Sequence, residues 1–148
     1  MWPRGEQGRY QWQIKGDVPY QIETARKLPK AEEYRGPGLA YERLDGLREW
    51  FFGDFEAERV MLMPERPWRD FYRQFGGEGQ MQVRERMVAT LTELMRRPDH
   101  ECVLAVSHGS AIKEFLDHVR GAAADERERV PGNCSVLHFA FVRRIRHV

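Results

Sequence analysis

The residues that point to chemistry in this sequence stand where an apolar run meets a helical pattern. His108 follows the run at 102–107 and precedes Gly109, after which apolar residues recur at helical spacing up to residue 119. This order predicts a buried strand that ends in a tight turn and leads directly into a helix. The first N–H groups of a helix and the positive end of its dipole attract anions. An imidazole there, with Gly109 and Ser110 beside it, indicates a site for a phosphoryl group; the alternative is a histidine that only caps the turn.

Glu49 is the second candidate for chemistry. It lies in the segment 47–56, which is dense in Trp and Phe around Gly53. A carboxyl group held against apolar rings resists ionisation and can then donate a proton near neutral pH. The alternative is structural, with 47–56 forming an apolar plug that has charged edges.

Four short stretches, in this order, resemble the histidine phosphatase superfamily in its phosphoglycerate-mutase-like branch. They are Leu-Arg-Glu-Trp at 47–50 with Phe-Gly-Asp-Phe-Glu at 52–56, Gly-Gly-Glu at 76–78, Val-Ser-His-Gly at 106–109 and Pro-Gly-Asn-Cys at 131–134. The resemblance covers residues 39–142. It implies a single α/β domain of three layers, a mostly parallel sheet with helices on both faces. It also implies transfer of a phosphoryl group from a small-molecule phosphate ester onto a histidine, with no metal and no cofactor.

The resemblance gives roles to the two candidates. Glu49 corresponds to the acid that protonates the leaving oxygen, and His108 to the second histidine, which hydrogen-bonds the phosphoryl oxygens. Both roles suit the chemistry, since an alkoxide leaves poorly unless protonated and a dispersed phosphoryl charge needs fixed donors.

The sequence departs from the family pattern at its start. The family's first strand leads into Arg-His-Gly, whose histidine is the nucleophile, but the five histidines here are all at position 100 or later: His100, His108, His118, His138 and His147. We therefore expect an N-terminally incomplete domain that lacks the first strand and the nucleophile. Three interpretations stay open: an active phosphatase or phosphomutase, a pseudophosphatase that binds a phosphate ester without turnover, and the remnant of a truncated gene. Unpaired sheet edges would also favour a homo-oligomer.

Periodicity predicts the elements that must position these residues. We expect helices over 20–28, 80–97 and 110–120 and strands over 102–107 and 134–142. Residues 1–148 form one domain with an irregular arm at 1–19, in which Tyr10, Trp12 and Ile14 alternate as in a strand. Residues 60–79 form a long loop with aromatic anchors, typical of a lid or binding loop.

Composition narrows the class of partner and location. With 24 basic and 23 acidic side chains, the chain offers no electrostatic case for binding nucleic acid or an anionic membrane. No apolar run is long enough to cross a bilayer, and the N-terminus lacks the apolar core of a signal peptide, so we expect a cytoplasmic protein. Cys102 and Cys134 are expected as reduced thiols, and no Cys/His spacing fits a zinc site.

Overall fold

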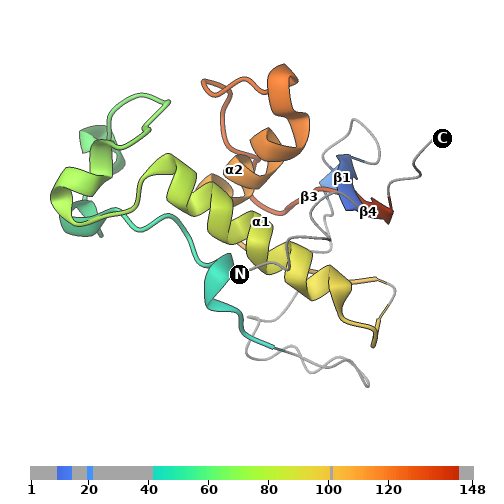
Figure 1. The fold of residues 1–148 in the computed structure, drawn as a ribbon. Coiled ribbons are helices and arrows are strands. Elements are labelled where there is room, and N and C mark those ends of the chain that lie inside the picture. The colour runs from blue at the N-terminus through green and yellow to red at the C-terminus, as the bar shows by residue number, and fades with distance from the viewer. Residues whose placement is uncertain (1–9, 15–19, 22–41, 101, 144–148) are drawn as a thin grey trace.

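Two helices form the centre of the structure, a computed structural model that describes residues 10–14, 20–21, 42–100 and 102–143. Helix α1 (Gln80–Arg96) packs against helix α2 (Gly109–Arg120), with short strands at one end of the pair (Figure 1). Strand β1 (Tyr10–Ile14) pairs antiparallel with β4 (Phe139–Arg143), and β2 (Tyr20–Gln21) pairs antiparallel with β3 (Ser135–Val136). Short 3₁₀ helices span Asp45–Leu47, Gly53–Phe55, Val60–Leu62, Phe71–Phe75 and Gly121–Ala123.

Both helices that position the candidate site agree with the predicted ranges. In α1, Val83 and Met87 are fully buried one turn apart, and the helix ends just before Pro98. Its start is capped by Gln82, whose Oε1 accepts the Gly79 N–H at 2.7 Å. In α2 the buried apolar residues are Ala111, Phe115 and Leu116. The period-3.6 apolar pattern was sufficient to predict both helices, although α2 also buries the charged residues Lys113, Glu114 and Asp117.

An aromatic cluster from the segment 50–75 forms one part of the core, beside the residues that the two helices contribute. Trp50 and Tyr72 are fully buried, and Trp68 meets both of their rings edge to face, at 5.2 Å and 5.4 Å between centroids. Further rings that pack into this cluster are Phe52, Phe55 and Phe71. The interpretation of 47–56 as an apolar plug therefore holds for Trp50, Phe52 and Phe55, whereas Phe51 is 44% exposed.

Strand β1 corrects the prediction of an irregular arm over 1–19. Trp12 explains why this part of the arm is ordered, since its ring packs on Phe115 of α2 at 5.0 Å and its Nε1 donates to Thr92 of α1 at 3.0 Å. The alternation at 10–14 that indicated a strand is confirmed, and its partner is β4. Residues 1–9 and 15–19 lie outside the described residues.

The strand predicted over 102–107 is not formed. These residues are assigned no regular structure, and Leu104 and Val106 are 76% and 71% exposed. A strand forms only where a neighbour accepts and donates its ladder hydrogen bonds, and the described strands pair with one another instead. Ser107 nevertheless anchors the end of the run, because its Oγ donates to the Leu47 carbonyl at 2.7 Å.

The strand predicted over 134–142 is interrupted, and the sheet is not the expected one. Residues 137–138 separate β3 from β4, and Cys134 has a positive φ of 61°. The pairs in the described ranges run antiparallel, so the mostly parallel sheet of three layers is not formed there; helices and strands do coexist, as in an α/β domain. The prediction of a helix over 20–28 is wrong at Tyr20–Gln21, which form β2. Residues 22–28 lie outside the described residues, and so do residues 39–41, the first part of the region that resembles the family.

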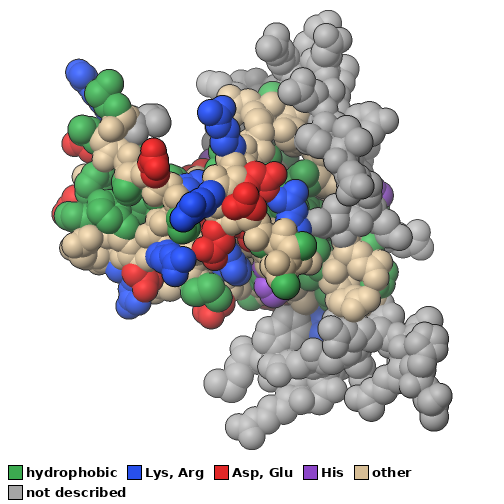
Figure 2. All heavy atoms as spheres, turned by 90° about the horizontal axis from the view of Figure 1, so that it is seen from above, with side chains coloured by type: hydrophobic (Ala, Val, Ile, Leu, Met, Phe, Trp, Pro, Cys, Tyr) green, Lys and Arg blue, Asp and Glu red, His purple; other side chains and the backbone are tan. Residues whose placement is uncertain are grey.

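The described surface is mixed in charge and carries two thiols. Neither described helix combines the length and the apolar character needed to cross a bilayer. Basic and acidic side chains are interspersed on the face shown in Figure 2. Cys102 and Cys134 are exposed free thiols, and the residues that the structure describes contain no group of three metal-ligating side chains.

Candidate functional site

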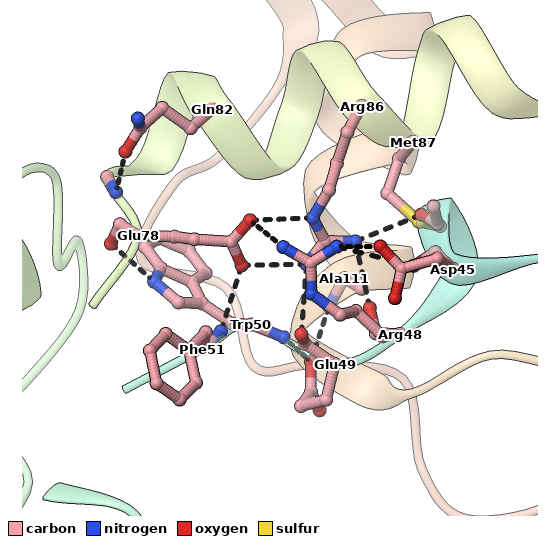
Figure 3. A network of polar contacts seen from close by, with 12 residues as sticks. Asp45, Arg48, Glu49, Trp50, Phe51, Glu78, Gln82, Arg86, Met87 and Ala111 are labelled. Carbon is pink, nitrogen blue, oxygen red and sulfur yellow. Dashed lines mark hydrogen bonds and ion pairs between the residues drawn. The ribbon is translucent and has the colours of Figure 1, made fainter. Parts of the chain in front are cut away.

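The start of helix α2 brings the two predicted residues together. His108 is the residue before the helix, and the half-buried Glu49 places its carboxylate over the first turn (Figure 3). Oε1 of Glu49 accepts the Ala111 N–H at 2.9 Å, and Oε2 accepts the Ser110 N–H at 3.3 Å. The two residues, 59 positions apart in the chain, thus lie at one helix terminus.

His108 does not serve as a side-chain cap. Its imidazole makes no capping hydrogen bond and the residue is exposed, while its carbonyl accepts the Ile112 N–H at 2.8 Å to close the first turn. His108 therefore occupies the N-cap position through its backbone, and its side chain takes no part in the cap. The ring is available to a ligand at the helix start.

The anion-binding groups predicted at this terminus are already engaged. The N–H of Ser110, predicted to bind phosphate, is directed at Glu49 instead, as is that of Ala111. An intramolecular carboxylate fills the position that the helix dipole favours for an anion. Gly109 is tightly covered, since a Cβ there would lie 3.2 Å from Val130. A phosphoryl group bound here must share or displace the contacts of Glu49.

Arg86 on helix α1 holds the backbone that carries Glu49. Its Nη1 donates to the carbonyls of Gly46 and Arg48, and its Nη2 to that of Glu49, each at 2.9 Å. The same guanidinium pairs with both carboxylate oxygens of Glu78, at 2.8 Å and 2.9 Å (Figure 3). A bidentate pair of this kind fixes the guanidinium plane, and so fixes the turn before Glu49.

Glu78 is a second fixed point of this network. Besides Arg86 it accepts from Arg48 at 2.8 Å and from the Phe51 N–H at 2.9 Å, while its carbonyl accepts from Trp50 Nε1 at 2.8 Å. Burial acts to raise the pKa of the Glu78 carboxyl, but the hydrogen bonds from Arg86 and Phe51 and the nearby positive charges outweigh it and hold this pKa below its ordinary value. The carboxylate is therefore charged and structural.

A second polar cluster lies one turn further along α2. Glu114 is fully buried and accepts from Arg84 at 2.8 Å and from Gln80 at 3.3 Å, and Arg66 Nη1 is 3.9 Å from it. Burial raises the pKa of Glu114 in spite of these donors. Burial lowers the pKa of Arg66, although the charges of Glu114 and Glu49 act in the opposite direction.

The sequence alone did not indicate these supporting residues. Glu78 lies in the Gly-Gly-Glu stretch at 76–78, but nothing in the sequence pairs it with Arg86. Glu114 was detectable, because it follows Ala111 by three residues and Ser110 by four and so shares the buried face of the helix. Arg66 gave no signal beyond its place in a long loop.

Comparison with known families gives one match. A family model described as histidine phosphatase superfamily (branch 1) matches residues 17–146, most of the chain. Neither the curated proteins nor the solved structures contain a match.

Proposed function

The chain belongs to the histidine phosphatase superfamily, and on that premise we propose that it binds a phosphate monoester at the start of helix α2 without hydrolysing it. The observation that carries the proposal is the contact between Glu49 and the first N–H groups of α2, directly after His108. The acid and the imidazole that the family resemblance selects are then within reach of one bound group.

Each of the two residues has a distinct role in the proposal. His108, with its exposed ring, donates to a phosphoryl oxygen. Glu49 faces the ester oxygen. Its carboxylate already accepts the Ser110 and Ala111 N–H groups, so a bound phosphoryl group must share these donors with it or displace it.

We propose binding without turnover because the covalent route of the family needs a nucleophilic histidine, and residues 1–99 contain no histidine. In this proposal His108 keeps the role of the second histidine, so no phosphoryl group is transferred to the protein.

The resemblance also supports a finer proposal about the fold. Residues 102–107 have the apolar character of a central strand, and pairing with a second copy of the chain would supply the missing neighbour and extend the sheet. The three-layer, mostly parallel sheet of the family is proposed for that assembled state.

The test measures binding and turnover separately. We expect no hydrolysis of p-nitrophenyl phosphate or 3-phosphoglycerate and no phosphohistidine, but a saturable NMR shift of residues 107–111 on addition of inorganic phosphate. Affinity should be roughly millimolar, or about 4 kcal/mol, because the N–H groups are already occupied. His108→Gln should weaken binding. His118→Gln is the matched control, since His118 lies ten residues further along α2, about 15 Å away by helical rise, and should leave binding unchanged.

Two results would contradict the proposal. Turnover that disappears in His108→Ala, with the label found on His108, would make this residue the nucleophile and the protein an enzyme. The absence of any saturable phosphate shift in the wild type would remove the binding function itself.

A further inference from the structure

Phe51 carries an exposed ring that the aromatic core leaves out. It is 44% exposed, whereas its neighbours Trp50 and Phe52 pack into the core. Among the residues that the structure describes, no other ring makes an aromatic contact with that of Phe51. Single exposed apolar residues are common, so exposure alone indicates no function. What distinguishes Phe51 is how firmly its backbone is held and where its ring lies.

The backbone of Phe51 is fixed on both sides by Glu78. The Phe51 N–H donates to Oε2 of Glu78 at 2.9 Å, and the Phe51 carbonyl accepts the Glu78 N–H at 2.8 Å. The preceding Gly77 allows this approach, because a Cβ there would lie 2.6 Å from the Phe51 carbonyl oxygen. A ring carried on a fixed backbone loses only side-chain freedom when a ligand packs on it. The entropy lost on such a contact is therefore small.

The Phe51 ring lies on the same side of the backbone as Glu49. The buried Trp50 between them turns its indole toward Glu78, while the Phe51 ring and the Glu49 side chain lie on the other side (Figure 3). The Cα atoms of residues two positions apart are at most about 7 Å from each other. Since the Glu49 carboxylate accepts the first N–H groups of α2, the Phe51 ring lies beside the proposed ligand position.

The charges around Phe51 favour an uncharged organic group on the ligand. In the proposed function Glu49 faces the ester oxygen, so the organic group extends past Glu49. The guanidinium groups of Arg48 and Arg86 are both engaged by Glu78. A second anionic group on the ligand would therefore meet the Glu49 carboxylate while these two cations are already paired. An apolar ring avoids that repulsion and covers the exposed face of Phe51.

We propose that Phe51 is a specificity-determining residue that selects a phosphate monoester with an aromatic organic group. This inference rests on the proposed function and names the ligand class of that same site. Two aromatic rings attract each other in offset-stacked or edge-to-face arrangements, and both are open to a ring that reaches the exposed side of Phe51. A small acidic ester such as 3-phosphoglycerate gains no such contact and brings a second negative charge to Glu49.

The experiment compares phenyl phosphate, inorganic phosphate and 3-phosphoglycerate in NMR titrations at pH 7. The wild type should bind phenyl phosphate about fivefold more tightly than inorganic phosphate, and 3-phosphoglycerate no more tightly than inorganic phosphate. Nuclear Overhauser effects should connect the phenyl protons with the Phe51 ring. Phe51→Ala should lose the preference for phenyl phosphate and keep the affinity for inorganic phosphate, whereas Phe51→Tyr, which keeps the ring, should retain both. Leu62→Ala is the matched control, because it truncates another exposed apolar side chain and should retain the preference.

The outcomes separate this inference from the proposed function. A wild type that binds inorganic phosphate but binds phenyl phosphate no more tightly contradicts the inference and leaves the proposed function standing. The same holds if Phe51→Ala keeps the preference, or if the phenyl protons contact other rings and not Phe51. The contact measurement uses the wild type alone, so it decides the matter even where a variant fails to fold. A wild type that binds neither compound removes the inference and the proposed function together.

Discussion

Replacing Glu49 by glutamine should destabilise the fold and tighten phosphate binding in the same variant. The carboxylate spans the first turn of α2, with Oε2 on the Ser110 N–H at 3.3 Å and Oε1 on the Ala111 N–H at 2.9 Å. Glutamine keeps one acceptor oxygen for these N–H groups and loses both the second acceptor and the negative charge. The opposite signs of the two effects make this the sharpest test of the site.

The loss of stability follows from the cap. A side-chain cap contributes about 0.5–2 kcal/mol, and a negative charge at a helix N-terminus about 0.3–1 kcal/mol. Since one acceptor is retained, we expect a loss of about 1 kcal/mol, which is roughly 2–4 °C in melting temperature for a domain of this size.

The gain in affinity follows from the removed charge. Two unit charges about 4 Å apart interact with about 4 kcal/mol at an effective dielectric constant of 20. Because Glu49 is only partly buried, solvent screens its charge and reduces the repulsion that a bound phosphate feels. We expect about 1.4 kcal/mol to remain, a tenfold tighter dissociation constant for phosphate.

The assay combines thermal unfolding with a phosphate titration followed by NMR on wild type and variant. Glu56→Gln is the matched control, because the exposed Glu56 lies in the same segment and its Oε1 also accepts a backbone N–H, that of Phe52 at 2.7 Å, but it is not on α2. It should not change phosphate affinity. Binding in Glu49→Gln that equals or falls below the wild type would refute the reasoning that the carboxylate competes with the ligand.

Two further predictions concern the support of the site and the apolar run before it. Glu78→Gln should lower the free energy of unfolding by about 3 kcal/mol at pH 7, because it leaves the partly buried Arg86 without its carboxylate. Since the fold lowers the pKa of Glu78, the wild type has this stabilisation above the ordinary glutamate pKa and loses it as the pH falls through the lowered value. Urea unfolding of the variant should lack that pH dependence. Light scattering should show that the wild type self-associates through residues 102–107 and that Leu104→Asp is monomeric. Met61→Asp is the control, because it changes another exposed apolar residue and should associate as the wild type does. A monomeric wild type would contradict this pairing.

The helices were predictable from local information, and the choice of Glu49 and His108 came from the family resemblance. A 3.6-residue apolar stripe specifies a helix by itself, and the motifs around Glu49 and His108 carried a family resemblance in order along the chain. The pairing of Arg86 with Glu78 was not predictable, because any of several arginines near 84–97 could have paired with that carboxylate until the packing of α1 was known.

The prediction of a strand over 102–107 was wrong because strand formation depends on a partner elsewhere in the chain. Its apolar residues indicate only that both of its faces suit burial, while its ladder hydrogen bonds must come from another segment. Strand β1 shows the converse. The sequence predicts an irregular arm over 1–19, yet Trp12 packs on Phe115 and donates to Thr92, and Tyr10–Ile14 pair with β4, so tertiary contacts decided the state of this segment.

The two interpretations of the segment 47–56, a plug and an acid, turn out to depend on one another. Trp50 is 1% exposed, and its indole donates to the Glu78 carbonyl, while the neighbouring carboxylate of Glu49 is directed at Ala111 (Figure 3). Because the buried indole cannot leave the core without losing both its packing and this hydrogen bond, the backbone at 49–50 has little freedom. The aromatic plug therefore aims Glu49 at helix α2, and a mutation that loosens Trp50 should act on the site through that residue.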